Sequence, residues 1–322
     1  MSNTKWCLFQ GDNTIQKDFK APTAPPWRDK ANRIKSYKTF SDKVKKMVSA
    51  ALILRRPLLI TGNPGIGKSS LAEAIREELQ LGEEVLYWRI GTQSKFKDGL
   101  YSYDALSRLH DMQVKEKDAE GNFVSEKVEN YLKLEALGVA FASTQQRVVL
   151  IDEIDKSPID LPNNLLHIFE ENQFEIPELK RLKKHSFVPF ENKDAFKEVT
   201  NGLVTCDMDT FPLIIMTSNG ERDFPAAFMR RCLHLEIKDP THDELAKIVE
   251  SHFKQIDKVV DPEKLKKIIT SFLAIRDDEK NLVQLSTDQL LNAVYLLEQE
   301  NSIDITEDDK EMLDGIWRNL IG

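Results

Sequence analysis

A glycine-rich segment offers the clearest chemistry in the sequence. Residues 62–69 satisfy the spacing GxxxxGK[ST], with an apolar, strand-like run before them and an amphipathic helical pattern after them. Glycines allow backbone N–H groups to turn inward around a phosphate, because no Cβ stands in the way. The Lys68 ammonium would pair with the terminal phosphates, and the Ser69 hydroxyl suits Mg²⁺. The predicted nucleotide-binding residues are Gly62, Asn63, Pro64, Gly65, Ile66, Gly67, Lys68, Ser69 and Ser70.

A pair of acidic residues follows a second apolar run. Residues 148–151 read Val-Val-Leu-Ile, and Asp152 and Glu153 come directly after them. If this run is a buried strand of a parallel sheet, both carboxylates emerge at the carboxyl edge, where open α/β sheets bind their ligands. Asp152 would then hold Mg²⁺ through its water shell. Glu153 would orient an attacking water and help to deprotonate it.

Two further segments carry side chains that suit phosphoryl transfer. Asn219 follows an apolar run at 213–217 and could hydrogen-bond the γ-phosphate or its water, although an asparagine before Gly220 is also an ordinary start of a turn. Arg230 and Arg231 precede the last apolar run. Adjacent arginines are usually a solvated face, and they gain a catalytic role only if the nucleotide of a neighbouring subunit lies opposite them.

Strands and helices must alternate to bring these segments to one place. Ser41 is placed to cap a helix that precedes the first strand. Buried strands that alternate with helices predict a parallel sheet covered on both faces. After Pro240 the strand pattern stops and only helices are expected. The predicted strands are 57–61, 85–90, 147–151, 213–217 and 232–237, and the predicted helices after Pro240 are 243–255, 261–275, 287–299 and 307–320.

Taken in order, these segments resemble the Walker A, Walker B, sensor 1 and arginine-finger elements of AAA+ ATPases, from about residue 36 to the end. The resemblance implies ATP and Mg²⁺ as ligands and a ring, usually hexameric, with the nucleotide between subunits. It implies a P-loop αβα sandwich with a five-stranded parallel sheet in the order 5-1-4-3-2, followed by a small all-α lid domain. The implied catalytic residues are Lys68, Glu153, Asn219, Arg231 and Arg230, and the implied metal ligands are Ser69 and Asp152.

The same resemblance divides the chain. An N-terminal extension is expected at 1–36, the ATPase core at 37–239 and the lid at 240–322. Two insertions in the core, near 91–146 and 174–211, are similar to those of the MoxR-like branch. MoxR-like ATPases commonly act with a separately encoded protein that contains a metal-binding adhesion module, so a partner of that kind is expected.

Two positions depart from the MoxR-like pattern. Residues 154–158 read Ile-Asp-Lys-Ser-Pro, where the branch has a phrase rich in Asn-Arg-Ala. Residues 286–288 read Ser-Thr-Asp, where the lid often carries the Ser-Pro-Arg of sensor 2. Because a carboxylate cannot bind phosphate as an arginine does, no sensor 2 residue is assigned.

The composition sets limits on compartment and partners. The chain has 322 residues and a formal net charge of −8, from 45 basic and 53 acidic residues, which argues against general adhesion to nucleic acid. No apolar run approaches the ~18 residues that cross a bilayer, and the first residues lack the layout of a secretory signal. The three cysteines are far apart and suit neither a metal site nor a disulfide framework. We therefore expect a cytoplasmic protein without a membrane partner.

Two segments leave two interpretations open. Residues 21–28, which are rich in proline, are either a plain linker or an arm whose Trp27 anchors on this subunit or the next. The basic cluster Lys180–His185 is either a solvated loop or a contact for an acidic peptide or a nucleic acid.

The leading functional hypothesis is an ATP-driven, chaperone-like ring that remodels a partner protein. The alternatives are a nucleotide-controlled switch or scaffold, which could serve in a bacterial conflict system, and a nucleic-acid remodelling ATPase. Kinase chemistry is disfavoured because Glu153 and Asn219 suit a water nucleophile. GTP is disfavoured because residues 192–195, Asn-Lys-Asp-Ala, lack the terminal aspartate of the guanine-reading motif.

Overall fold

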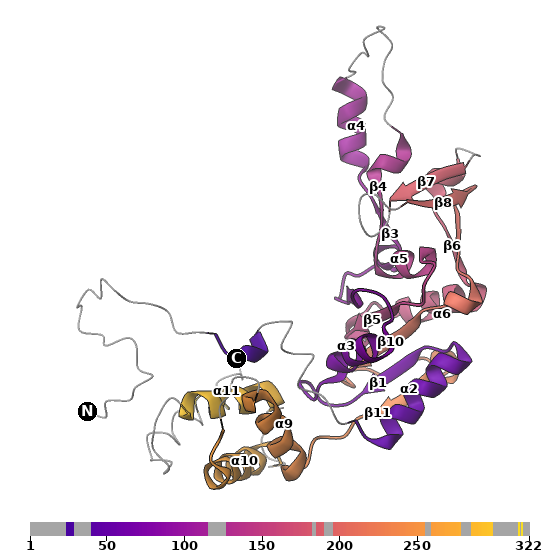
Figure 1. The fold of residues 1–322 in the computed structure, drawn as a ribbon. Helices are drawn as coiled ribbons and strands as arrows, with labels where there is room; N and C mark the ends of the chain where they lie inside the picture. Colours follow the sequence, from indigo (N-terminus) through magenta and orange to yellow (C-terminus); the bar gives the residue numbers. More distant parts are fainter. Residues whose placement is uncertain are drawn as a thin grey trace, which may run out of the picture. The chain divides into compact units, whose positions relative to one another are not determined.

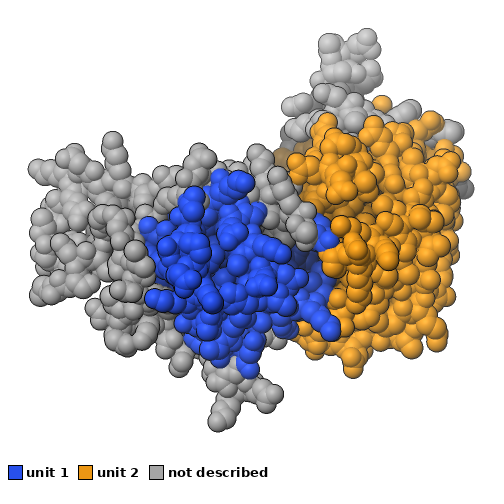
Figure 2. Space-filling model, turned by 60° about the horizontal axis from the view of Figure 1, so that its bottom comes forward, with its two compact units in different colours: residues 1–40, 62–70, 237–322 blue, residues 41–61, 71–236 orange. Residues whose placement is uncertain are grey.

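The computed structural model of the chain describes residues 24–28, 40–114, 127–181, 185–189, 196–254, 259–277, 285–298, 315 and 317. The chain divides into two compact units (Figure 2). Unit 1 comprises residues 1–40, 62–70 and 237–322, and unit 2 comprises residues 41–61 and 71–236. The helix predicted at 307–320 lies outside the described residues, except for Gly315 and Trp317.

Unit 2 is built on a five-stranded parallel sheet with the order β11-β1-β10-β5-β2. When these five strands are numbered one to five in the order in which they occur in the chain, the sheet order is 5-1-4-3-2. The central strands are buried along most of their length because helices cover both faces of such a sheet. All five predicted strands are present, and their ends differ from the prediction by at most one residue. They are β1 (Leu58–Thr61), β2 (Leu86–Arg89), β5 (Val148–Asp152), β10 (Leu213–Ser218) and β11 (Leu233–Glu236).

The helices of unit 2 pack around this sheet (Figure 1). Helix α2 lies against β1 and β11, and the Ser41 hydroxyl caps it by accepting the Val44 N–H at 3.4 Å, as predicted. Helix α5 covers β2 and β5. The helices near the sheet are α2 (Asp42–Leu54), α3 (Lys68–Leu79, which starts within residues 62–70), α5 (Ala136–Ala142), η5 (Ile154–Lys156), α6 (Leu161–Glu171), η6 (Met208–Thr210) and α8 (Ala226–Arg231).

The two predicted insertions carry small antiparallel sheets of their own, which were not predicted from the sequence. The first insertion contains η3 (Phe96–Gly99), β3 (Tyr101–Tyr103), α4 (Ala105–Val114), η4 (Val128–Tyr131) and β4 (Leu132–Leu134). The second contains β6 (Gln173–Glu175), α7 (Pro177–Lys180), β7 (His185–Pro189), β8 (Phe196–Thr200) and β9 (Leu203–Thr205). Strand β7 packs against β4 and η4, so the insertions join at one end of unit 2 (Figure 1).

The polar contacts between the insertions centre on Glu178. Its carboxylate accepts a hydrogen bond from the Tyr101 hydroxyl at 2.8 Å and pairs with the Lys97 ammonium at 3.0 Å. The basic cluster at 180–185 is not one loop: Lys180 ends α7 and pairs with Glu175 at 2.6 Å, and His185 begins β7. Residues 182–184 lie outside the described part of the chain.

The described part of unit 1 beyond residue 237 is helical. It contains α9 (His242–Lys254), α10 (Pro262–Arg276) and α11 (Thr287–Leu297), close to the predicted spans. These helices share an apolar core that also takes in Trp27, from η1 (Pro26–Arg28). Trp27 is 3% exposed, so residues 24–28 are an anchored segment rather than a plain linker. Among the helices that the structure describes, none is long and apolar enough to cross a membrane.

Candidate nucleotide site

The loop at residues 62–67 requires glycine at two close approaches within unit 1. Gly65 has φ +75°, and a Cβ at this position would lie 2.2 Å from the Cβ of Ser286. A Cβ on Gly62 would lie 2.4 Å from the carbonyl oxygen of Ile237. Neither space admits a side chain. We call residues 62–70 the phosphate loop; they pack closely against residues at the start of α11 and after β11.

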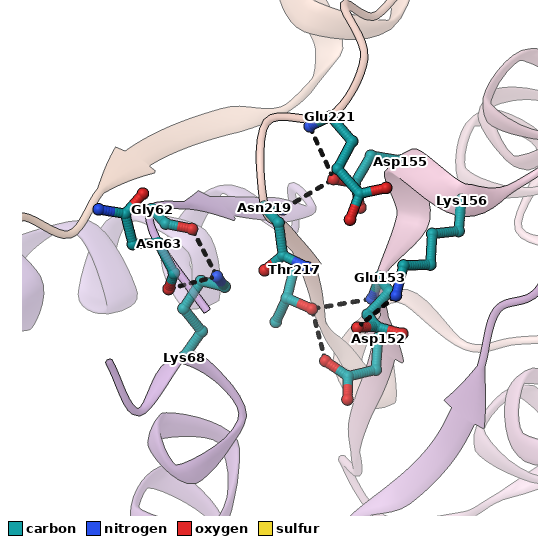
Figure 3. A network of polar contacts seen from close by, with 10 residues as sticks. All are labelled: Gly62, Asn63, Lys68, Asp152, Glu153, Asp155, Lys156, Thr217, Asn219 and Glu221. Atoms are coloured by element: carbon teal, nitrogen blue, oxygen red, sulfur yellow. Dashed lines mark hydrogen bonds and ion pairs between the residues drawn. The ribbon is translucent and has the colours of Figure 1, made fainter. Parts of the chain in front are cut away.

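The ammonium of Lys68 lies over the backbone of the phosphate loop. Its Nζ donates to the carbonyl oxygens of Gly62 at 2.5 Å and Asn63 at 2.9 Å, and the residue is 7% exposed (Figure 3). The Asn63 amide donates to Asp239 at 2.7 Å. Ser69 and Ser70 follow in the first turn of α3, whose N-terminal N–H groups carry partial positive charge. The loop thus gathers donors and a cation, which suits an anionic ligand.

In unit 2, the acidic pair is held by a threonine on the neighbouring strand. The Thr217 hydroxyl donates to Asp152 Oδ1 at 2.5 Å, and its oxygen accepts the Glu153 N–H at 2.9 Å (Figure 3). Thr217 is 1% exposed. Because β5 and β10 are parallel neighbours, both carboxylates emerge where the sheet ends. The predicted position of Asp152 and Glu153 at this edge is confirmed.

Glu153 stands in a left-handed conformation and forms an ion pair. Its φ is +60°, an uncommon value for a residue with a side chain, which marks the sharp exit from β5. Lys156 Nζ lies 2.9 Å from Glu153 Oε1 (Figure 3). The pKa of Lys156 is raised, first by this hydrogen bond and then by the surrounding acidic charges, against the effect of burial. The carboxylate that the sequence assigns to water activation therefore already has a cationic partner.

A buried aspartate fixes the loop that begins at Asn219. One oxygen of Asp155, Oδ2, accepts the backbone N–H of Asn219 at 2.8 Å and that of Glu221 at 3.2 Å (Figure 3). Asp155 is 4% exposed. A carboxylate that accepts two backbone donors is a strong anchor in a low-dielectric setting. Asn219 is thereby tied to the short helix that follows Glu153.

The two arginines lie at the other edge of the sheet. All five strands are parallel, so the carboxyl end of β5 and the amino end of β11 are at opposite edges. Arg231 ends α8 just before β11, and its guanidinium pairs with Glu170 of α6. The guanidinium of Arg56 donates to the carbonyl oxygens of Arg230 and Arg231. The arginines are therefore not brought together with Asp152 and Glu153 of their own chain.

Comparison with known proteins identifies the family. A model described as "AAA domain (dynein-related subfamily)" matches residues 57–232, which is more than half of the chain. The chain belongs to this family. It therefore carries an AAA+ P-loop ATPase domain, and the matched range includes the phosphate loop, the acidic pair and Asn219.

The chain is also similar to one curated protein and to one solved structure. Lon protease 2 of Bacillus subtilis (strain 168) is 24% identical over 276 residues, which cover 83% of this chain and 46% of the protease. The chain thus spans about half the length of this curated relative. Among solved structures, the RuvB Holliday junction branch migration motor of Thermotoga maritima is 14% identical, with a TM-score of 0.45, and the match covers 85% of this chain and 68% of the motor.

Sequence patterns did not single out three residues that contact the acidic pair or Asn219. Thr217 lies inside an apolar run, where a β-branched residue looks like a strand former. Asp155 and Lys156 follow the acidic pair and look like an exposed, charged turn. The pairing of β10 with β5 accounts for Thr217: Met216 lies opposite Ile151, so the next residues along the two parallel strands, Thr217 and Asp152, are neighbours. The side-chain contacts themselves required the structure.

Proposed function

We propose that this chain is a Mg²⁺-dependent ATPase of the MoxR-like branch, which assembles into a ring and remodels or activates a partner protein in a chaperone-like manner. The observation that carries the proposal is the bridge of Thr217 between Asp152 and Glu153. It holds one carboxylate for a metal ion and orients the backbone of the next residue, which bears the candidate base. Such a pair at the carboxyl edge of a parallel sheet, in a chain with a phosphate loop, suits hydrolysis of a nucleoside triphosphate.

The proposed nucleotide contacts come from residues 62–70. Backbone N–H groups of the loop and of the first turn of α3 would bind the β- and γ-phosphates. The Lys68 ammonium, now on two carbonyl oxygens, would exchange a neutral partner for an anionic one, which is the stronger hydrogen bond. Oxygen donors such as the Ser69 hydroxyl and the Asp152 carboxylate are those that Mg²⁺ prefers, so both fit as its holders. When bound, the ion neutralises charge on the phosphates.

The proposed reaction is attack of water on the γ-phosphorus. The water oxygen forms a bond to phosphorus, the bond to the β–γ bridging oxygen breaks, and ADP and inorganic phosphate leave. Glu153 would orient the water and take its proton. For this step its carboxylate has to turn from Lys156 towards the water. Asn219, tied down by Asp155, would donate to the γ-phosphate or to the water.

The position of the arginines supports a ring. Arg230 and Arg231 cannot join the acidic pair of their own chain from the opposite edge of the sheet, so their proposed role requires a neighbouring subunit. A heterologous interface that closes on itself gives such an arrangement. To act as the finger, Arg231 would exchange Glu170 for the neighbour's phosphates. We infer a hexamer by the family resemblance.

The two insertions support the MoxR-like assignment and a protein partner. Each carries its own small sheet, and β7, Glu178 and Tyr101 join them into one body at an end of unit 2. We propose that this body contacts the partner, which would contain a metal-binding adhesion module. We further propose that residues 240–322 act as the lid and residues 37–239 as the ATPase core.

A second function is favoured by one observation. The ion pair between Glu153 and Lys156 holds the candidate base away from catalysis. A chain in this state would bind ATP without rapid turnover, which is the behaviour of a nucleotide-controlled switch or scaffold. The two functions differ in whether a partner raises turnover.

Steady-state ATP hydrolysis tests the proposal. The unmodified chain should hydrolyse ATP with Mg²⁺, a candidate protein partner should raise the rate, and duplex DNA should not. Lys68→Ala should abolish tight binding or at least hydrolysis, because backbone donors cannot replace the ammonium. Near-normal turnover of Lys68→Ala would remove the basis of the proposal.

A companion variant tests the role of the base. Glu153→Gln should bind ATP and Mg²⁺, hydrolyse poorly and accumulate as ATP-loaded rings, measured by equilibrium binding and by mass in solution. Loss of nucleotide binding in Glu153→Gln would mean that Glu153 is structural and that the base lies elsewhere.

A further inference from the structure

Trp27 is built into the helical part of unit 1. Its ring packs against three aromatic side chains, with centroid distances of 5.9 Å to Phe253, 5.9 Å to His252 and 5.4 Å to Tyr295. Its indole N–H donates to Asn292 Oδ1 at 3.0 Å. Burial of a tryptophan with its N–H satisfied is a strong anchor. The next residue, Arg28, therefore has its backbone held beside α11.

A chain of polar contacts leads from Trp27 to the first turn of α11. Asn292, which accepts the indole N–H, donates through Nδ2 to Asp288 Oδ2 at 3.1 Å. The same carboxylate oxygen lies 4.0 Å from the Arg28 guanidinium. The side chains of Arg28 and Asp288 are 58% and 51% exposed. Because the ion pair is long and exposed to solvent, it contributes little to stability. The Arg28 guanidinium can therefore leave Asp288 for a more strongly bound anion at a small cost in free energy.

The first turn of α11 touches the phosphate loop. Ser286 caps this helix and accepts the Gln289 N–H at 3.4 Å. Its Cα and Cβ would lie 2.9 Å and 2.2 Å from a Cβ on Gly65, so the cap and the loop are in direct contact. Asp288 stands two residues after the cap. A carboxylate in a helical turn whose cap contacts the proposed phosphate loop would oppose ATP by charge repulsion.

We propose that Arg28 is a nucleotide-binding residue: anchored by Trp27 at the first turn of α11, it turns from Asp288 to the γ-phosphate of ATP. The inference rests on the proposed binding of ATP by residues 62–70. It gives the N-terminal segment a function, because that segment supplies the basic group that residues 286–288 lack. The bound nucleotide and the placement of residues 24–28 are then coupled.

The test is the affinity for a non-hydrolysable ATP analogue and for ADP, measured by calorimetry on the full chain. Arg28→Ala should lower the affinity for the ATP analogue about tenfold and change the affinity for ADP less than about twofold. This is the effect of losing one charge-assisted hydrogen bond to the γ-phosphate. Arg28→Lys should keep part of the preference for the ATP analogue over ADP. Arg181→Ala, which removes another exposed arginine, is the matched control and should bind both ligands normally.

A double variant separates direct contact from charge balance. In Arg28→Ala combined with Asp288→Asn, affinity for the ATP analogue should stay low, because the phosphate contact is still absent. Recovery of affinity would show that Arg28 only neutralises Asp288 and would overturn the proposal, as would an unchanged preference in Arg28→Ala. If the unmodified chain binds no ATP, the proposed function fails instead, so the two failures are distinguishable. Thermal unfolding of Arg28→Ala verifies the fold.

Discussion

Thr217 and Asp152 share a hydrogen bond of 2.5 Å between the threonine hydroxyl and Oδ1 of the carboxylate. The same hydroxyl oxygen accepts the Glu153 N–H at 2.9 Å. The hydroxyl therefore has both a donor and an acceptor role at a buried position, which serine, but not valine, could reproduce. One residue of β10 thus sets the direction of two consecutive residues at the end of β5.

Thr217→Val should slow hydrolysis far more than it weakens nucleotide binding. Valine keeps the shape but leaves the Asp152 oxygen and the Glu153 N–H without this partner, so the base moves. A displacement of about 1 Å can cost as much as about 100-fold in rate. Turnover and ATP affinity would be measured together. Thr217→Ser is the control and should keep most of the activity, and equal turnover in both variants would contradict the role assigned to the hydroxyl.

Lys156→Met should raise basal turnover. The ammonium holds Glu153 at 2.9 Å, and removing it frees the carboxylate to face the water. Because the pair is partly exposed, the expected gain is about two- to fivefold, the range of such an ion pair. Any stimulation by a protein partner should shrink correspondingly. Lys156→Arg keeps the pair and should behave like the unmodified chain.

A fall in the basal turnover of Lys156→Met would contradict the restraining role of Lys156. Lys156 would then position the base rather than restrain it, and the switch function would lose its supporting observation.

The parts of the molecule that could be predicted are those governed by local pattern. The strand β5 was predicted because four buried apolar residues precede Asp152, and the phosphate loop because its glycines and Lys68 stand at fixed spacings. The contact between Trp27 and Asn292 spans 265 residues, and no periodicity encodes it. The three-residue strands β3 and β4 were missed for another reason: so short a run shows no clear alternation.

Protonation of His252 should make unit 1 less stable in acid. The residue is 3% exposed, and burial lowers its pKa to about 4, although the charge of Asp288 raises it in part. The unfolded chain takes up this proton near pH 6.5, so the stabilising effect is complete above that pH and is lost as the pH falls towards 4. This residue should lower the free energy of unfolding by about 2 kcal/mol between pH 7 and pH 5.

The measurement is denaturant unfolding at pH 7, 6 and 5, compared with His252→Phe. Phenylalanine keeps an aromatic ring against Trp27 but cannot titrate. The variant should therefore lose less stability in acid than the unmodified chain. Identical pH dependence in the two proteins would assign the effect to other groups.

The strongest test of assembly concerns Arg231, because its proposed role exists only between subunits. A finger stabilises charge on the transferring phosphoryl group and changes the rate by on the order of 10³–10⁵. Arg231→Ala should leave ATP affinity of the isolated subunit nearly intact while it reduces turnover sharply. Arg230 could share or replace this role, so Arg230→Ala is measured in parallel. Glu170→Ala is the matched control, since it breaks the ion pair of Arg231 without removing the arginine.

Mixing variants then shows whether the two sites lie in different chains. Arg231→Ala supplies an intact phosphate loop, and Lys68→Ala supplies an intact arginine, so a mixed ring should recover part of the activity that each lacks alone. This complementation requires a heterologous interface that closes into a ring, and the rate should rise with protein concentration as subunits assemble. If the rate per subunit is independent of concentration and mixing restores nothing, each subunit hydrolyses ATP alone. In that case Arg231 serves the fold of its own chain through Glu170, and the ring is absent.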